Sequence, residues 1–455
     1  MTTFAPAETD TRWTPQPDSA RLIGRFVGEF LERCPSAADL ARRMREQTGT
    51  RFVDWIDHIA LPAATELAKE LDRTGFSLQP SDEGAKCFVN PRGAFPPVLL
   101  RHSPVVQVAL KVERVADFAA TWQIPPEEPI EGEPLCPLRR VRAFSEHEAE
   151  LWAIERHGFR GFSPPLWDAD VVMRAMQQIE VFRRRRRDFD DDEQGFENLD
   201  GLLDAAIAEL GLDYACDLFF AAEREYWERR NHAAQIQKRR QDRLGLGWAN
   251  HDHHTYRSSR QYFTRLIGIF EKLGFVCRER FYAGAQAGWG AQVLEQPRAG
   301  IVVFADVDLA PDEVLCDFAH EPLAPRQHLG TVGLWCGLHG EAILQAGMHH
   351  LECQFDFDAL REQLESRESI HVMKPFTDMA HLRQAFTEGE RWQVSESRIA
   401  RLLANGQVTQ QEADQFRVHG AIGSHLENLE RNDGFKGFNQ QGIDEIITRT
   451  DPRGA

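Results

Sequence analysis

Apolar residues recur at helical spacing near the N-terminus and again in the middle of the chain. From Ser19 they fall three and four positions apart, which predicts a helical region up to about residue 47. Within residues 168–243, the stretches 199–210 and 215–243 contain no proline and combine an apolar face with many charges. We therefore expect a helical insertion there, which serves packing or homo-oligomer contacts rather than catalysis.

Two stretches with strand character each lead into a helix that ends at glycine. Residues 52–61 are β-rich, Pro62 suits the first turn of a helix, and Gly75 suits its end. Residues 252–257 precede a predicted helix over 258–273, which stops at Gly274. The pattern further predicts a helix at 145–157, helix and loop from 358 on, and strands at 86–90, 98–101, 105–115, 139–144, 277–282, 290–296, 301–309, 331–338 and 348–355.

The two stretches match each other in their residues as well as in their order. Asp57-His58 lies in the first strand and Asp252-His253 in the second, and a Gly-Phe pair follows the helix in both. The spacing from histidine to glycine differs by about one helical turn. This match indicates a duplicated β-α-β unit, in which the two Asp-His positions can face each other across one cavity.

Two imidazoles and one carboxylate form a site that suits a single divalent metal with open positions. His58 and His253 are the candidate imidazole ligands, with His254 on the opposite face of its strand. The candidate carboxylates are Asp306, Glu341 and Glu352, and the pattern alone does not separate them. A cationic Arg257 beside His253 would suit an anionic substrate.

Composition narrows the classes of function. The chain has 455 residues, 42% of them hydrophobic, with a net charge of −18 and a pI near 5.4. This acidity argues against a nucleic-acid partner, and no apolar run is long enough for a membrane span. The eight cysteines are scattered and no signal peptide is evident, so we expect buried free thiols and a cytoplasmic protein.

With these residues identified, the chain resembles the vicinal oxygen chelate superfamily and, distantly, its 2-oxoadipate dioxygenase/decarboxylase family. The segment 252–257 resembles that family's second metal-histidine strand, and His58 falls at the first metal-histidine position. His339-Gly340-Glu341 resembles the segment with the metal glutamate, which places Glu341 first among the carboxylates. The family has an arginine for the substrate carboxylate where this chain has Pro62, so Arg101 or Arg257 is expected to replace it.

The resemblance implies an α+β fold in which duplicated βαβββ units form a partly open β-barrel, with a large helical insertion and helical additions at both ends. The expected segments are an N-terminal tail with helices (1–50), a first unit (51–125), a linking strand-helix unit with the insertion (138–247), a second unit (248–356) and a helical and loop C-terminal region (357–455).

The implied function is an Fe2+-dependent oxygenase that acts on a small 2-oxo or hydroxy acid and O2, with oxidative decarboxylation as one outcome. His58, His253 and Glu341 would hold the metal, which could instead be Mn2+ or Zn2+, and no catalytic residue is predicted beyond the metal site. Two alternatives remain: a metal-dependent, glyoxalase-like lyase or isomerase, and a metal-free binding or scaffold protein of the same fold.

Overall fold

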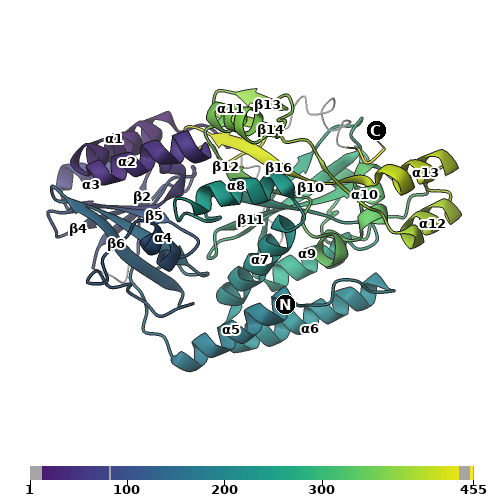
Figure 1. The fold of residues 1–455 in the computed structure, drawn as a ribbon, viewed down its shortest axis with the longest axis horizontal. Helices are drawn as coiled ribbons and strands as arrows, with labels where there is room; N and C mark the ends of the chain where they lie inside the picture. The colour runs from purple at the N-terminus through teal and green to yellow at the C-terminus, as the bar shows by residue number, and fades with distance from the viewer. Residues whose placement is uncertain (1–12, 81–83, 440–450, 454–455) are drawn as a thin grey trace.

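The computed structural model describes residues 13–80, 84–439 and 451–453. Two sheets lie side by side along the molecule (Figure 1). The first, drawn in purple and blue with its helices, occupies one end, and the second, in green and yellow, occupies the middle. Each sheet has a large hydrophobic core of its own.

The N-terminal helices pack on the first sheet through one apolar face. α1 (Pro17–Arg33) buries Leu22, Ile23, Phe26, Val27 and Phe30, which recur at helical spacing. α2 (Pro35–Arg43), the π-helix η1 (Met44–Thr48) and the 3-10 helix η2 (Phe52–Trp55) lead from it into the sheet.

The first sheet has seven strands in the order β2-β3-β4-β1-β5-β7-β6. Its members are β1 (Ile56–Pro62), β2 (Ser77–Gln79), β3 (Lys86–Val89), β4 (Val98–Arg101), β5 (Val106–Lys111), β6 (Leu138–Glu146) and β7 (Ala149–Arg156), with helices α3 (Thr65–Arg73) and α4 (Val115–Thr121).

The second sheet has nine strands, eight of them in the order β13-β14-β16-β12-β8-β11-β10-β9, with β15 paired to β16. It curls into a partly open barrel. Its members are β8 (His251–Arg257), β9 (Val276–Tyr282), β10 (Trp289–Gln296), β11 (Ile301–Asp308), β12 (His350–Gln354), β13 (Thr377–Met379), β14 (Leu382–Phe386), β15 (Glu390–Trp392) and β16 (Ala421–Arg431), with helices α9 (Phe263–Lys272) and α11 (Phe357–Arg367).

The two sheets repeat one topology. β1 pairs in parallel with β4 and antiparallel with β5, and β5 pairs in parallel with β7. In the second sheet, β8 likewise pairs in parallel with β11 and antiparallel with β12, and β12 pairs in parallel with β16. Strands β1 to β4 with α3, and β8 to β11 with α9, each form a βαβββ unit, and β12, β13, β14 and β16 with α11 form a third, to which β15 adds a strand outside this order. Strands β5 to β7 with α4 form a unit one strand shorter. The predicted α+β fold with duplicated units is therefore confirmed, with two units in each sheet.

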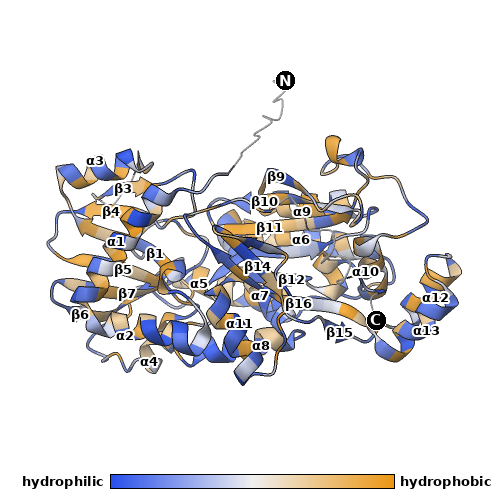
Figure 2. Cartoon of the chain, turned by 90° about the horizontal axis from the view of Figure 1, so that it is seen from above, coloured by the Kyte–Doolittle hydropathy of each residue, from blue (hydrophilic) through white to orange (hydrophobic). Residues whose placement is uncertain are grey.

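The predicted helical insertion connects the two sheets. It comprises α5 (Ala169–Arg183), α6 (Asp192–Leu210), α7 (Leu212–Glu228) and α8 (His232–Asp242). Helices α12 (Glu396–Ala404) and α13 (Gln410–His419) lie at the end of the molecule away from the first sheet (Figure 1), and both carry hydrophilic and hydrophobic stretches (Figure 2).

Three predicted elements were wrong. Residues 331–338 form α10 (Thr331–His339) instead of a strand, because a short apolar run that is buried all round shows no period. Residues 145–157 contain the end of β6 and the whole of β7 instead of a helix, so the first sheet extends past residue 125. The region after residue 357 contributes β13 to β16 to the second sheet, besides its helices and loops. The 3-10 helix η3 (Glu313–Leu315) and the π-helix η4 (Ala342–Ala346) complete the elements.

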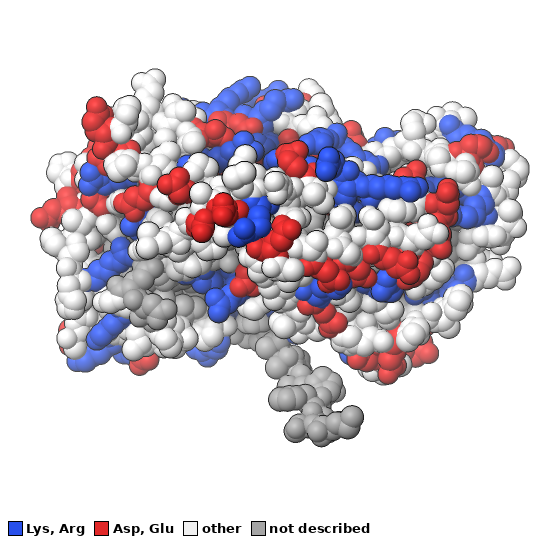
Figure 3. Space-filling view, turned by 90° about the horizontal axis from the view of Figure 1, so that it is seen from below, with Lys and Arg blue, Asp and Glu red and all other residues white. Residues whose placement is uncertain are grey.

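Acidic and basic side chains both occur across the face shown in Figure 3. In the described part of the chain, no helix is both long and apolar enough to cross a membrane.

Candidate metal centre

Three neighbouring strands of the second sheet place a histidine and two carboxylates together. His253 on β8 is opposite Glu352 on β12, and Glu352 is opposite Glu427 on β16. Residues in register on adjacent strands project from the same face. The three side chains are buried, and their ligand atoms lie within 4.8 Å of one another.

His253 is held in one orientation by the aspartate that precedes it. Its Nδ1 lies 2.8 Å from Oδ2 of Asp252, and Arg431 donates two hydrogen bonds to that carboxylate, at 2.7 and 2.9 Å. Gln354 donates a further bond to Asp252. A carboxylate on one ring nitrogen leaves the other nitrogen for a metal, and Nε2 of His253 indeed lies 3.1 Å from Oε1 of Glu352.

The two carboxylates are buried beside each other, which is costly without a cation. Burial raises the pKa of Glu427 well above its usual range, and the negative charge of Glu352 raises this pKa further. Burial would also raise the pKa of Glu352, but His253 and His350 outweigh it and lower that pKa to about 2. Burial would lower the pKa of His253, yet Glu352 and Asp252 raise it to about 10. A divalent cation would replace the proton on His253 and offset both carboxylates.

A small cavity of about 70 Å3 opens at this cluster and contains further unsatisfied groups. Arg257 lines it with its side chain almost fully buried, and its Nε and Nη1 have no hydrogen-bond partner. Its nearest carboxylate oxygen, Oδ2 of Asp306, is 3.9 Å away, and Oδ1 of Asp306 also has no partner. Burial, only partly offset by Arg257, raises the pKa of Asp306 to about 8.

His350 contacts the same carboxylate from a second direction. Its Nε2 lies 2.6 Å from Oε1 of Glu352, and its Nδ1 has no hydrogen-bond partner. His350 is not part of the group whose ligand atoms all lie within 4.8 Å of one another. It lines the cavity together with His349, so imidazoles surround the site on this side.

The donor set fits a divalent metal. One imidazole and two carboxylates supply nitrogen and oxygen ligands of the kind that Fe2+, Mn2+ and Zn2+ accept. Oε2 of Glu352 is buried without a hydrogen-bond partner, so a lone pair remains for coordination. We therefore name His253, Glu352 and Glu427 as the residues that would hold a metal.

His58 occupies the equivalent position in the other sheet. Its Nδ1 lies 2.7 Å from Asp57, and Arg156 donates bonds of 2.5 and 2.7 Å to Asp57, as Arg431 does to Asp252. The strands beside it carry Ala109 and Trp152 where the second sheet has Glu352 and Glu427. His58 belongs to no described group of three potential metal ligands. The structure thus repeats the Asp-His pair without bringing both histidines to one cavity.

The remaining predicted residues lie elsewhere. Glu341 precedes η4 and accepts hydrogen bonds from the Ser258 hydroxyl and the Ser259 amide, and it does not line the small cavity. Arg101 is in the first sheet and donates to Gln107, 2.9 Å away. His254 points to the other side of its strand and lines a separate cavity of about 2220 Å3, as the alternation of the strand predicts.

Glu427 was not among the predicted ligands, although the sequence contains a signal that leads to it. Residues 158–162 have the sequence Gly-Phe-Arg-Gly-Phe, and residues 434–438 have Gly-Phe-Lys-Gly-Phe. Both segments follow an arginine that donates to carbonyls of its own segment, Arg156 in the first copy and Arg431 in the second. This second repeat makes β7 and β16 equivalent strands of the two sheets. In the second copy, Glu427 lies four residues before Arg431.

Comparisons with known proteins give weak likenesses in structure. No family model matches the chain, and no curated protein matches it. A mutant of 4-hydroxymandelate synthase from Streptomyces coelicolor has a TM-score of 0.27 and 11% identity, covering 88% of this chain and 98% of its own. Methylmalonyl-CoA epimerase from Mycobacterium tuberculosis has a TM-score of 0.23 and 13% identity over 40% of this chain and 88% of its own.

Glyoxalase I from Zea mays has a TM-score of 0.18 and 14% identity, covering 23% of this chain and 43% of its own. The strand order shows the α+β fold of duplicated βαβββ-like units that the sequence predicted.

Proposed function

We propose that the chain is a divalent-metal enzyme that acts on a small 2-oxo or hydroxy acid, with Fe2+ as the metal and O2 as co-substrate. The observation that carries this proposal is the buried group of His253, Glu352 and Glu427 beside a small cavity. Bound Fe2+ would supply a Lewis acid and the redox chemistry that O2 activation requires.

Arg257 binds the substrate carboxylate in this proposal. A guanidinium whose Nε and Nη1 are buried without partners is costly, and a carboxylate ligand satisfies it with charge-assisted hydrogen bonds. Its position at the same cavity as the metal group sets the distance between the substrate's anionic end and its reacting carbon. The small volume limits the substrate to a short acid.

Asp306 is placed to hold or move a proton at its Oδ1. That atom is buried, has no hydrogen-bond partner and belongs to a residue that lines the cavity. A carboxyl group with a raised pKa can donate a proton near neutral pH, which a carboxylate with an ordinary pKa cannot. We assign Asp306 the proton transfer to and from the bound substrate.

An oxygen-electrode screen tests this function. The full chain, loaded anaerobically with Fe2+, is mixed with a panel of short 2-oxo and hydroxy acids, and oxygen uptake is measured for the wild type and for Asp306→Asn. We expect uptake with at least one acid, and its loss in Asp306→Asn while iron remains bound. Lack of uptake with every acid, from protein that holds its iron, contradicts the oxygenase.

One observation favours a second candidate, a metal-dependent lyase or isomerase that needs no oxygen. Fe2+ oxygenases characteristically use two histidines and one carboxylate, whereas this group has one histidine and two carboxylates. The same panel run in an anaerobic chamber separates the two candidates. Conversion of an acid without oxygen supports the lyase or isomerase, and conversion that requires oxygen supports the oxygenase.

A further inference from the structure

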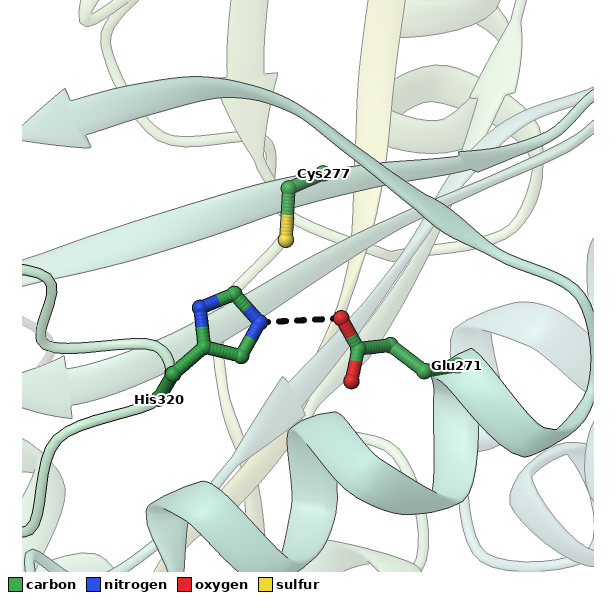
Figure 4. Close-up of side chains that lie close together, drawn as sticks. All are labelled: Glu271, Cys277 and His320. Carbon is green, nitrogen blue, oxygen red and sulfur yellow. Dashed lines mark hydrogen bonds and ion pairs between the residues drawn. The ribbon is translucent and has the colours of Figure 1, made fainter. Parts of the chain in front are cut away.

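A second group of potential metal ligands lies on the outside of the second sheet. It consists of Glu271 near the end of α9, Cys277 on β9 and His320 in the loop between β11 and α10. Figure 4 shows the thiol and the carboxylate directed toward the imidazole from two different elements. All three residues are exposed, and their ligand atoms lie within 4.8 Å of one another.

The histidine of this group is oriented as zinc-bound histidines are. Nδ1 of His320 lies 2.8 Å from Oδ2 of Asp317, and its Nε2 lies 2.9 Å from Oε1 of Glu271. Metal-bound histidines usually direct the second ring nitrogen to a carboxylate, which fixes the ring. Arg280 lies 3.3 Å from Asp317 and holds that carboxylate in turn.

We propose that Glu271, Cys277 and His320 form a surface zinc site, distinct from the interior metal centre. One thiolate, one imidazole and one carboxylate make a donor set suited to Zn2+, and three protein ligands leave the fourth tetrahedral position for water. The thiolate ligand also distinguishes this site from the interior group, which consists of one histidine and two glutamates.

The bound zinc would fasten a long loop to the sheet. Residues 309–330 connect β11 to α10, and His320 lies within them. Glu271 and Cys277 belong to the helix and strand beneath, so a metal between them and His320 closes this loop onto the rest of the fold. Zinc binding to Cys277 displaces the thiol proton, which passes to the solvent.

Cysteine alkylation tests the site without depending on any activity. Cys277 and Cys316 are the exposed cysteines among the described residues. Cys316 lies in the same loop as His320 but is not one of the proposed ligands. The full chain is stripped with a chelator, given two equivalents of ZnCl2 so that the interior group and the surface group can both be filled, and treated with iodoacetamide, and each peptide is measured by mass spectrometry. We expect zinc to slow alkylation of Cys277 by about 10-fold or more and to leave Cys316 unchanged.

Two exposed histidines of the loop provide matched variants. His320→Ala removes the ligand and should abolish the protection of Cys277, whereas His328→Ala should retain it. With Co2+ in place of zinc, a thiolate-to-metal absorption band should appear in the near ultraviolet and should disappear in Cys277→Ser but not in Cys316→Ser. Equal protection of both cysteines, or protection that survives His320→Ala, overturns the proposal.

Discussion

Arg257 combines full burial with unsatisfied hydrogen-bond donors, and this combination identifies it as a ligand-binding residue. Its Nε and Nη1 lack partners, and the nearest carboxylate oxygen is too distant for a hydrogen bond. A buried cation in this state lowers the stability of the free protein and raises its affinity for an anion. The residue is therefore expected to matter for binding and not for folding.

We expect Arg257→Met to raise the KM for an acid substrate by about 100-fold, since a buried charged pair contributes roughly 3 kcal/mol to binding. The same change should leave the melting temperature equal or higher, because it removes an unsatisfied buried charge. Steady-state kinetics and thermal melting measure both. Arg101→Met is the control. A similar KM for the two variants would show that Arg257 does not bind the substrate carboxylate.

Asp252 and Asp57 are structural counterparts with different predicted effects on metal binding. Each accepts two hydrogen bonds from an arginine and holds a histidine through Nδ1. Only the histidine held by Asp252 belongs to the potential metal group among the described residues.

Replacing either aspartate by asparagine should lower the free energy of unfolding by about 3–5 kcal/mol, because a largely buried ion pair loses its negative charge. Asp252→Asn should in addition weaken metal binding by about 10- to 100-fold, whereas Asp57→Asn should not. Chemical denaturation and metal titration of the two variants check this. Equal losses of metal affinity would mean that His58 is also a ligand.

At the scale of elements, the sequence predicted the duplication because it depends on local features. The repeated Asp-His pairs and the glycine after each helix were enough to align β1 with β8. The short apolar helix α10 could not be distinguished from a strand, since its residues are buried on every side. The C-terminal strands β13 to β15 are short, and β16 is buried along almost its whole length, so these strands gave no clear alternation.

The neighbours of His253 could not be derived in the same way. Glu352 and Glu427 meet His253 because β12 lies between β8 and β16, and this strand order is a tertiary property. Asp306 and Glu352 were predicted as alternatives for one carboxylate, and the structure places both at the same cavity as His253. Glu341, favoured by the family resemblance, lies with Ser258 and Ser259.

At the scale of the molecule, His157 joins the first sheet to the helical insertion. It follows β7, and its ring nitrogens lie 3.0 Å from Asp217 on α7 and 3.1 Å from Glu155. Burial would lower the pKa of His157, but the two carboxylates outweigh it and raise that pKa from 6.5 to about 9. The protonated imidazole therefore stabilises the contact between these two parts.

This raised pKa makes stability depend on pH in a defined direction. A folded-state pKa above the unfolded value gives stabilisation that is complete below about pH 6.5 and is lost as the pH rises through 9. The loss should be about 3 kcal/mol at most. Denaturation curves between pH 6 and 10 should show this decline in the wild type and a weaker one in His157→Gln. If stability depends on pH identically in the wild type and in His157→Gln, His157 is not the source of the decline.

The central claim is that His253, Glu352 and Glu427 hold the metal of the second sheet. Anaerobic Fe2+ titration tests it most directly, carried out in a Cys277→Ser background so that the surface site does not contribute. We expect one equivalent to bind, Glu427→Gln to weaken binding by about 10-fold or more, and Glu341→Gln to bind as the parent does. Unchanged affinity in Glu427→Gln, or loss of iron in Glu341→Gln, would contradict the account.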